Sequence, residues 1–289
     1  PAGAGKTMLA RRMPTIMPGM DVEESIEISK IYSVSGLLTE KEPLVKIRPF
    51  RAPHHTVSVQ ALTGGGRRPK PGEISLATGG ILFLDELPEF SRAALETLRQ
   101  PLEDREVTVS RVEATVTYPA NFQLVAAMNP CPCGHFPDLA RCRCTEGQIT
   151  RYLQKISGPL LDRIDLCVEA SPVTYGDVRG GGENEASGAI RARVEQAREI
   201  QKERFMEENI RCNGEMAGRH IRKYCVLGKE EETFMEEIFE KLALSARMHD
   251  RILKVARTTA DLAGESKIRL SDLCEAVSYV KSREKFWGN

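Results

Sequence analysis

Two short stretches of the sequence carry residue types that bind and cleave a nucleoside triphosphate. The first, residues 1–7, reads PAGAGKT and supplies the end of the phosphate-binding pattern Gly-x4-Gly-Lys-Ser/Thr, whose opening glycine would stand one residue before Pro1. Glycines let backbone N–H groups turn toward phosphate oxygens, and the next helix directs its N-terminal dipole at them. Lys6 would reach the β- and γ-phosphates, and the Thr7 hydroxyl would hold Mg²⁺. Against the alternative of a chance glycine-rich turn, we expect nucleotide contacts at Gly3, Ala4, Gly5, Lys6, Thr7 and Met8.

The second stretch, residues 81–86, reads ILFLDE. A continuous apolar run of this kind is typical of a fully buried parallel strand, and the two acids follow where such a strand leaves the core. Asp85 is suited to the magnesium shell and Glu86 to polarising the attacking water. Solvated carboxylates at a strand end are common on their own but uncommon beside GKT. The two stretches together therefore predict nucleoside-triphosphate hydrolysis.

Two further polar residues follow apolar runs later in the chain. Residues 122–129 read FQLVAAMN, a predicted strand ending in Asn129, whose amide could orient the lytic water or sense the γ-phosphate. Residues 157–166 read SGPLLDRIDL, and Arg163 stands where many ring ATPases place an arginine finger that reaches the neighbouring subunit's nucleotide. Such a finger stabilises charge on the transferring phosphoryl group. The alternative for Arg163 is a surface salt bridge.

These residues need a parallel sheet to position them, and the sequence pattern predicts one in the N-terminal part only. Residues 1–171 carry strand and loop motifs, residues 172–189 are rich in Gly, Glu and Asn as a linker would be, and residues 190–289 show helical spacing. Ser271 and Asp272 read as the N-cap of the last helix. The apolar positions with that spacing are Ile190, Val194, Ala197, Ile200, Phe234, Ile238, Leu242, Ile252, Ala256, Ala260, Leu273, Ala276, Val277 and Val280. We expect an α/β nucleotide domain followed by a small helical lid.

A basic loop inside the nucleotide domain is a candidate for substrate contact. Residues 48–80 make the passage between the two ATP motifs longer than the fold needs, and they contain a Gly/Pro-rich loop with Arg67, Arg68 and Lys70. A flexible basic loop can contact a phosphate backbone, and an ordinary solvated loop is the alternative. The adjacent His54 and His55 lack a third ligand nearby, so we interpret them as structural or substrate-facing rather than metal-binding.

A predicted hairpin is the second candidate for substrate contact. Residues 102–122 read LEDREVTVSRVEATVTYPANF, in which apolar and polar residues alternate on both sides of Arg111. This alternation predicts a β-hairpin with Arg111 near its tip. Arg111 is then either a substrate contact or an ordinary exposed arginine at a turn.

Four of the eight cysteines crowd into one segment, with the spacing C-x-C-x8-C-x-C. They are Cys131, Cys133, Cys142 and Cys144, with His135 as a spare ligand. Clustering of this kind in a chain of cytosolic character indicates a metal site in preference to disulfide bonds. Four thiolates suit a closed tetrahedral zinc site that fixes a loop without a catalytic task. Reduced free thiols or a redox pair are the alternative.

The composition excludes several classes of protein. The 289 residues are 41% hydrophobic and 28% charged, an ordinary globular balance. Lys plus Arg and Asp plus Glu number 41 each, so nucleic acid is not bound through bulk charge, although a local basic patch could bind it. No apolar run reaches the roughly 18 residues of a membrane span, and the start lacks the pattern of a signal peptide. We expect a cytoplasmic protein without a membrane partner.

The succession of motifs strongly resembles the magnesium-chelatase-like AAA+ proteins of the ComM/YifB type, over essentially the whole chain. It runs GAGKT, FRAPHHTVS, PGEISLATGGILFLDELPEF, AAMNPCPCG, CRC and SGPLLDRIDL, and the APHHT and NPCPCG–CRC motifs are the most specific. The resemblance implies a P-loop NTPase with an AAA+ αβα core, helix-2 and pre-sensor-1 hairpin insertions, and an all-α lid. It also implies ATP and Mg²⁺ as cofactors, homo-hexameric rings on single-stranded or branched DNA, and branch migration during natural transformation and recombination.

The same resemblance assigns roles residue by residue. The matches are Lys6 and Thr7 to Walker A, Asp85 and Glu86 to Walker B, Asn129 to sensor 1, Arg163 to the arginine finger, and Arg247 to the sensor 2 arginine of the lid. The Arg111 hairpin is similar to the insertion with which replicative ring helicases grip DNA. The sequence shows neither the family's Lon-like N-terminal domain nor the strand and glycine that precede Pro1 in the Walker A pattern. We therefore expect these residues by themselves to fold poorly and to bind ATP weakly.

Three functions from different classes compete. The leading one is a DNA-translocating ATPase. A magnesium-chelatase-type or protein-remodelling motor would share every ATP residue and differ only in what its pore grips, so net charge does not discriminate between them. A nucleotide-binding regulatory module without turnover is disfavoured because Glu86 and Arg163 are both present. Stimulation of ATP hydrolysis by single-stranded or forked DNA would separate the first two.

Overall fold

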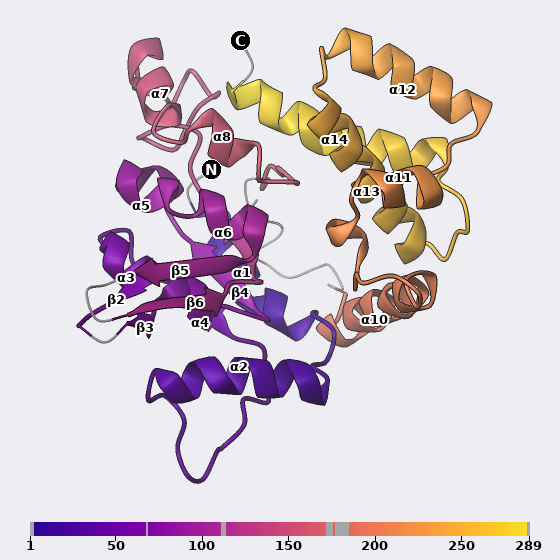
Figure 1. Ribbon diagram of the computed structural model, residues 1–289. Helices are drawn as coiled ribbons and strands as arrows, with labels where there is room; N and C mark the ends of the chain where they lie inside the picture. The colour runs from indigo at the N-terminus through magenta and orange to yellow at the C-terminus, as the bar shows by residue number, and fades with distance from the viewer. Residues whose placement is uncertain (1–2, 68, 111–113, 172–175, 177–184, 288–289) are drawn as a thin grey trace. The chain divides into compact units, whose positions relative to one another are not determined.

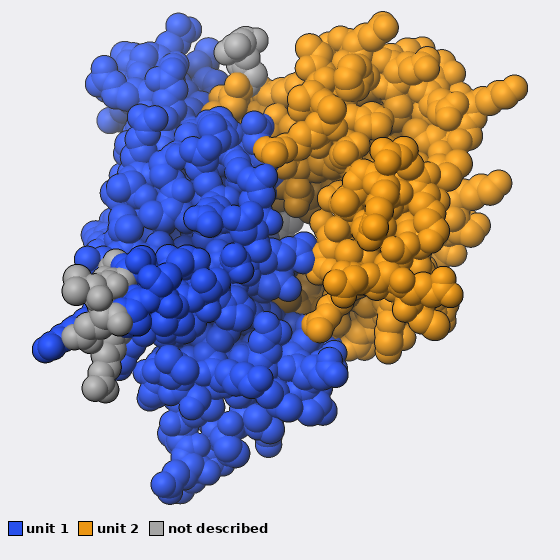
Figure 2. All heavy atoms as spheres, viewed as in Figure 1, with its two compact units in different colours: residues 1–14, 19–164, 170–182 blue, residues 15–18, 165–169, 183–289 orange. Residues whose placement is uncertain are grey.

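The computed structural model describes residues 3–67, 69–110, 114–171, 176 and 185–287, and the chain divides into two compact units (Figure 2). Unit 1 comprises residues 1–14, 19–164 and 170–182, and unit 2 comprises residues 15–18, 165–169 and 183–289. Among the described residues, every strand belongs to unit 1, whereas unit 2 is helical (Figure 1). The predicted order, an α/β part followed by a helical part, is therefore confirmed. Most of the expected linker lies outside the described residues, and the boundaries at 171 and 190 stay predictions.

A three-stranded parallel sheet forms the centre of unit 1. Its strands are β1 (Phe50–Arg51), β4 (Ile81–Leu84) and β7 (Gln123–Ala126), in the order β1-β4-β7. Every residue of β4 is buried, as its unbroken apolar run predicts. The register pairs Leu84 with Ala126, so β4 and β7 end together and the residues that follow them emerge at the same edge of the sheet.

A close approach between backbones explains one glycine of this sheet. Gly80 precedes β4, and a Cβ atom at that position would lie 2.0 Å from the carbonyl oxygen of Pro49, the residue before β1. The Ile81 N–H donates to the same oxygen at 2.8 Å. A side chain at residue 80 would force the first strand away and break the pairing that brings β1 beside β4.

Short helices surround the sheet of unit 1. They are α1 (Lys6–Arg12), α2 (Val22–Val34), α3 (Val59–Thr63), α4 (Glu73–Leu76), α5 (Arg92–Glu96), α6 (Arg99–Asp104), α7 (Glu146–Leu153) and α8 (Gly158–Leu161). The longest of them, α2, begins with a capping box between Asp21 and Glu24. It buries Ile28 and Ile31, and the hydroxyl of Tyr32 donates to the carbonyl oxygen of Leu76 in α4 at 3.1 Å.

The hairpin predicted around Arg111 is present. Strand β5 (Glu106–Ser110) pairs antiparallel with β6 (Thr115–Pro119), and Val107 and Val109 are buried while their neighbours in β5 are exposed. Arg111 itself lies outside the described residues. A second, shorter pair joins β2 (Gly64–Gly65) to β3 (Lys70–Pro71). That either segment corresponds to a named AAA+ insertion stays a proposal.

Unit 2 packs its helices around one apolar core. They are α10 (Ser187–Arg204), α11 (Gly218–Tyr224), α12 (Lys229–Lys241), α13 (Ala246–Leu262) and α14 (Leu270–Trp287), with a 3₁₀ turn at Asn213–Glu215. The apolar positions predicted in the last two helices are all buried: Ile252, Ala256 and Ala260 in α13, and Leu273, Ala276, Val277 and Val280 in α14. Helical periodicity therefore identified the buried face of these two helices. In α10 and α12 only Ala197 and Ile238 of the predicted positions are buried, and the others are partly exposed.

The predicted start of the last helix needs a correction. We expected Ser271 and Asp272 to form the N-cap, but α14 already begins at Leu270. Asp272 instead lies in the first turn, where its Oδ2 accepts from the backbone N–H of Arg269 at 2.9 Å. The side chain of Arg269 also pairs with this carboxylate, at 3.1 Å. An aspartate in a first helical turn satisfies a free N–H and suits the helix dipole, so it resembles a cap in sequence.

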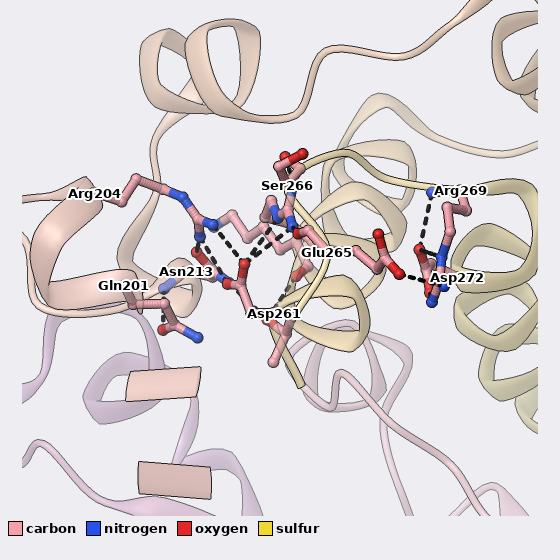
Figure 3. Close-up of polar contacts among 11 residues, drawn as sticks. Gln201, Arg204, Asn213, Asp261, Glu265, Ser266, Arg269 and Asp272 are labelled. Atoms are coloured by element: carbon pink, nitrogen blue, oxygen red, sulfur yellow. Dashed lines mark hydrogen bonds and ion pairs between the residues drawn. The ribbon is translucent and has the colours of Figure 1, made fainter. Parts of the chain in front are cut away.

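A buried charge network connects α10 to α13 (Figure 3). The fully buried carboxylate of Asp261 accepts from Arg204 Nη1 at 2.7 Å, from Arg257 Nε at 3.1 Å and from Asn213 Nδ2 at 2.7 Å. Burial lowers the pKa of Arg257, and the charge of Asp261 opposes that shift. Each buried charge in the network has a partner, so the loss of one member would leave a buried charge unpaired.

Among the described residues, no helix combines the length and the apolar character needed to cross a bilayer.

Candidate nucleotide-binding site

The structure brings the two predicted ATP motifs into direct contact. The Thr7 hydroxyl, in the first turn of α1, donates to Oδ2 of Asp85 at 2.6 Å. Asp85 directly follows the buried strand β4, so this strand fixes the carboxylate beside the start of α1. A hydroxyl and a carboxylate are the oxygen ligands that Mg²⁺ prefers beside nucleotide phosphates. The pair therefore fits the magnesium site predicted from the sequence.

Lys6 contacts the amide that follows the neighbouring strand. Its Nζ donates to Oδ1 of Asn129 at 3.0 Å, and Asn129 lies three residues beyond the end of β7. Partial burial lowers the pKa of Lys6, and the negative charge of Asp85 opposes that shift. Four predicted residues, Lys6, Thr7, Asp85 and Asn129, thus lie at one edge of the sheet.

The loop before α1 has the backbone that phosphate binding needs. Gly3 and Gly5 have φ angles of 77° and 70°, in the left-handed region that glycine adopts without strain. Gly5 is the N-cap residue of α1 and no side chain caps this helix end, so N–H groups of the first turn are available to an anion. The side chain of Met8, the last predicted contact, is largely exposed.

Glu86 is held in an unusual conformation beside a histidine. Its φ and ψ angles are 54° and 47°, a left-handed conformation rare for a residue with a side chain. Its backbone N–H donates to Oδ1 of Asp85 at 3.0 Å, and its Oε2 lies 3.5 Å from Nδ1 of His55. The side chain is 60% exposed, so water can reach the carboxylate that is expected to polarise it.

His55 is a site residue that the sequence analysis did not identify. We interpreted His54 and His55 as structural or substrate-facing, and only the second of them faces Glu86. The two rings are tilted by 34° with centroids 4.1 Å apart, and the Nδ1 of His54 lies 2.9 Å from the Thr56 hydroxyl, away from Glu86. The signal that could have found His55 is its position four residues after β1, which ends at the same edge of the sheet as β4.

Tyr152 of α7 is the second site residue that the sequence did not indicate, and it contacts Asn129. Its hydroxyl hydrogen-bonds the backbone of Asn129. Burial raises the pKa of Tyr152 to about 12, helped by the nearby charge of Glu89. The phenol therefore stays neutral and supports the segment that presents the Asn129 amide to Lys6.

Arg163 is held by its own chain. Its Nη2 forms an ion pair with Glu103, and its Nη1 donates to the carbonyl oxygen of Pro159 at 2.7 Å. The side chain is only 16% exposed, and its Nε is buried with no hydrogen-bond partner among the described residues. This is the salt bridge that the sequence left open as the alternative. A role toward a neighbouring subunit stays a proposal.

The remaining predicted contacts are dispersed. Arg247 lies in the first turn of α13, in unit 2. Arg67 and Lys70 are exposed on and beside the short β2–β3 pair of unit 1. Arg68 and Arg111 lie outside the described residues.

The four clustered cysteines converge after Asn129. The Sγ atoms of Cys131, Cys133, Cys142 and Cys144 all lie within 4.8 Å of one another, and all four are free thiols. Backbone N–H donors, first that of Arg143 and then that of His135, lower the pKa of Cys133 to about 6. His135, the expected spare ligand, thus contributes its main chain, and its imidazole is not part of the cluster. The cluster could hold a metal ion.

The fold and the site together define the family. A family model for magnesium chelatase, subunit ChlI, matches residues 1–178, and a model for the C-terminal part of the same subunit matches residues 184–280. The chain belongs to the magnesium chelatase family of AAA+ ATPases.

Three relatives show which members of the family this chain is similar to. The chain is 47% identical to competence protein ComM of Haemophilus influenzae over 283 residues, which cover 96% of this chain and 54% of that protein. It is 46% identical to YifB of Salmonella typhimurium over 280 residues, with the same coverage. The 67 kDa subunit of magnesium chelatase from Heliobacterium mobile is 24% identical over 230 residues, 68% of this chain and 33% of that protein. The predicted resemblance is confirmed, and the chain spans about half the length of ComM and YifB.

Proposed function

We propose that this chain hydrolyses ATP and couples the hydrolysis to movement of DNA through a ring of six copies. The contact between Thr7 and Asp85, at 2.6 Å, is the observation that carries the ATP part. It joins two motifs that lie 78 residues apart in the sequence, and its two oxygens suit Mg²⁺. Thr7 and Asp85 would hold the ion, which would supply positive charge against the charge that develops on the phosphate.

Each site residue then has one task. Lys6 binds the β- and γ-phosphates, and Asn129, which hydrogen-bonds it, senses the γ-phosphate or orients the lytic water. Glu86 accepts the proton of the attacking water, for which its exposed carboxylate is suitably placed. Arg163 leaves Glu103 in the assembled ring and stabilises the nucleotide of the adjacent copy, and Arg247 contributes from the helical unit.

The DNA part rests on the relatives. The 47% identity to a competence protein far exceeds the 24% identity to a magnesium chelatase subunit, so metal insertion is the less favoured substrate class. The exposed Arg67 and Lys70 of unit 1, with Arg68 and Arg111, are the proposed DNA contacts.

The proposed location is the cytoplasm. All eight cysteines are free thiols, as is usual in that reducing compartment. We assign Zn²⁺ to the four-cysteine cluster.

The test is ATP turnover by the purified full-length protein, rather than by residues 1–289 alone, with and without forked DNA. We expect DNA to stimulate turnover, and we expect Arg67→Gln/Lys70→Gln to weaken DNA binding and to make the stimulation less sensitive to salt, because fewer counterions are displaced. The control is Lys41→Gln/Lys46→Gln, which removes the same charge from exposed positions of the loop after α2. Turnover that DNA leaves unchanged would reject DNA as the substrate. Absence of ATP turnover would reject the ATPase itself.

A further inference from the structure

We infer that the four-cysteine cluster is a zinc site that positions Asn129 against Lys6, so that metal occupancy sets how tightly the phosphate loop holds nucleotide. The inference rests on the ATP site proposed above and adds a second ligand site that controls it. Its basis is the chain order Asn129-Pro130-Cys131, which places a buried cysteine two residues after the amide that Lys6 contacts.

The separations among three of the sulfurs are close to those of a tetrahedron around one ion, and the fourth sulfur, that of Cys144, lies within 4.8 Å of the others. Zn–S bonds of about 2.3 Å in tetrahedral geometry place neighbouring sulfurs about 3.8 Å apart. The observed separations are 3.4 Å for Cys131–Cys133, 3.8 Å for Cys131–Cys142 and 3.6 Å for Cys133–Cys142. A disulfide would need about 2.05 Å, so none of these three pairs is disulfide-bonded, and four convergent free thiols suit one metal ion.

Backbone N–H donors point at two of the four sulfurs. The Phe136 N–H donates to Cys131 Sγ at 3.4 Å, and the backbone N–H groups of His135 and Arg143 point at Cys133 Sγ. N–H donors of this kind stabilise the negative charge that four thiolates place on one ion. Cys133 and Cys144 also line an open hollow of about 540 Å³, which gives an ion a route to the cluster.

Both ends of the cysteine segment support Asn129. At one end, Cys131 lies two residues after Asn129 in the chain. At the other end, Cys144 precedes Thr145, the N-cap of α7. From that helix Tyr152 reaches back to hydrogen-bond the Asn129 backbone. An ion that holds Cys131 and Cys133 to Cys142 and Cys144 therefore ties α7 to the segment after β7. Without the ion, the loop between Cys133 and Cys142 can open, and both supports of the Asn129 amide loosen together.

The experiment measures the zinc content and the ATP affinity of the protein separately. Protein purified without a metal-affinity tag is analysed for zinc beside Cys142→Ser/Cys144→Ser and the control Cys212→Ser/Cys274→Ser, which removes two thiols from unit 2. We expect about one zinc per chain in the wild type and the control, as for a closed tetrahedral site, and none in the first variant. Zinc near zero in wild-type protein kept reduced and free of chelator would overturn the inference.

ATP affinity is then measured with a fluorescent analogue, which needs no hydrolysis. The zinc-free variant and Asn129→Ala should each bind about tenfold more weakly, the scale typical of lost outer supports of a site. Combining them should weaken binding little further, because both act through one amide. Wild-type affinity in the zinc-free variant, or additive losses in the combination, would contradict the coupling.

A second route covers a variant that fails to fold. Zinc is removed from the wild type by a thiol-competing chelator and then returned. The inference predicts that ATP affinity falls and recovers with zinc, and an affinity unchanged through the cycle would overturn it. If wild-type protein bound zinc but no ATP, the proposed function would fail while the zinc site stood.

Discussion

The Nδ1 atom of His55 lies 3.5 Å from the Oε2 atom of Glu86. Glu86 is also fixed at its main chain, where its N–H donates to Asp85 and its φ angle of 54° is one that a non-glycine residue seldom adopts. A strained backbone persists where its surroundings over-determine it, often at a functional site. His55 thus contacts the side chain of this residue, and Asp85 holds its main chain.

Removal of the imidazole should slow turnover. We expect His55→Ala to lower kcat by about tenfold, the lower range for lost supports of a reacting group, and to leave ATP affinity unchanged. His54→Ala is the matched control, since the Nδ1 of His54 contacts Thr56 and not Glu86. Steady-state kinetics of the two variants decide the matter, and an equal loss in both would indicate that the pair is only structural.

Glu86→Gln should separate binding from hydrolysis. The amide keeps the shape but cannot accept a proton, so we expect normal ATP binding with hydrolysis slower by about 10²- to 10⁴-fold. Glu89→Gln is the control: this acid lies in the same short helical turn, where it pairs with Lys155 at 3.4 Å. Hydrolysis by Glu86→Gln at a rate close to the wild type would remove Glu86 from the mechanism.

Arg163 should act across a boundary between copies. Mixed Arg163→Ala and Lys6→Ala proteins, each inactive alone, should recover part of the activity because some shared sites contain both intact residues. Glu103→Gln, which removes the ion-pair partner of Arg163, should retain activity, since Arg163 must leave that partner to reach a neighbour. If mixed rings form and no mixture recovers, Arg163 works within its own chain.

Loss of the central carboxylate of unit 2 should destabilise that unit. Asp261→Ala leaves Arg204 and Arg257 buried without their anion, which we expect to cost about 3–5 kcal/mol of unfolding free energy. Glu265→Ala is the control, because its ion pair with Arg269 is about half exposed on both sides and such pairs contribute at most about 1 kcal/mol. Denaturant unfolding of both variants measures the difference, and a loss near 1 kcal/mol for Asp261→Ala would contradict the role of the network.

Much of the site could be predicted because its signals are local. The run ILFL predicts a buried parallel strand without any tertiary information, so Asp85 had to emerge at the edge of the sheet. GKT likewise places Thr7 in the first turn of a helix. The contact between Thr7 and Asp85 then follows from how P-loop folds join a strand end to a helix start.

The unpredicted features depend on contacts between distant segments. Glu86 is supported by His55, and Asn129 is supported by Tyr152. The sequence next to Glu86 or Asn129 does not indicate which distant residue will contact it. The salt bridge from Arg204 to Asp261 spans 57 residues, and no periodicity predicts it. The misplaced N-cap at Ser271 and Asp272 has a different cause, since an aspartate in the first turn and one at the cap both accept from a backbone N–H at the start of a helix.

The rate of Mg²⁺-dependent ATP hydrolysis, compared between the protein and its Lys6→Ala variant, tests the account most directly. The comparison is made at one protein concentration, with magnesium present and with magnesium chelated. We predict turnover that requires Mg²⁺ and falls by about 100-fold or more in Lys6→Ala, as when a principal charge-stabilising donor is removed. Equal turnover in the two proteins, or turnover that survives chelation, would contradict it.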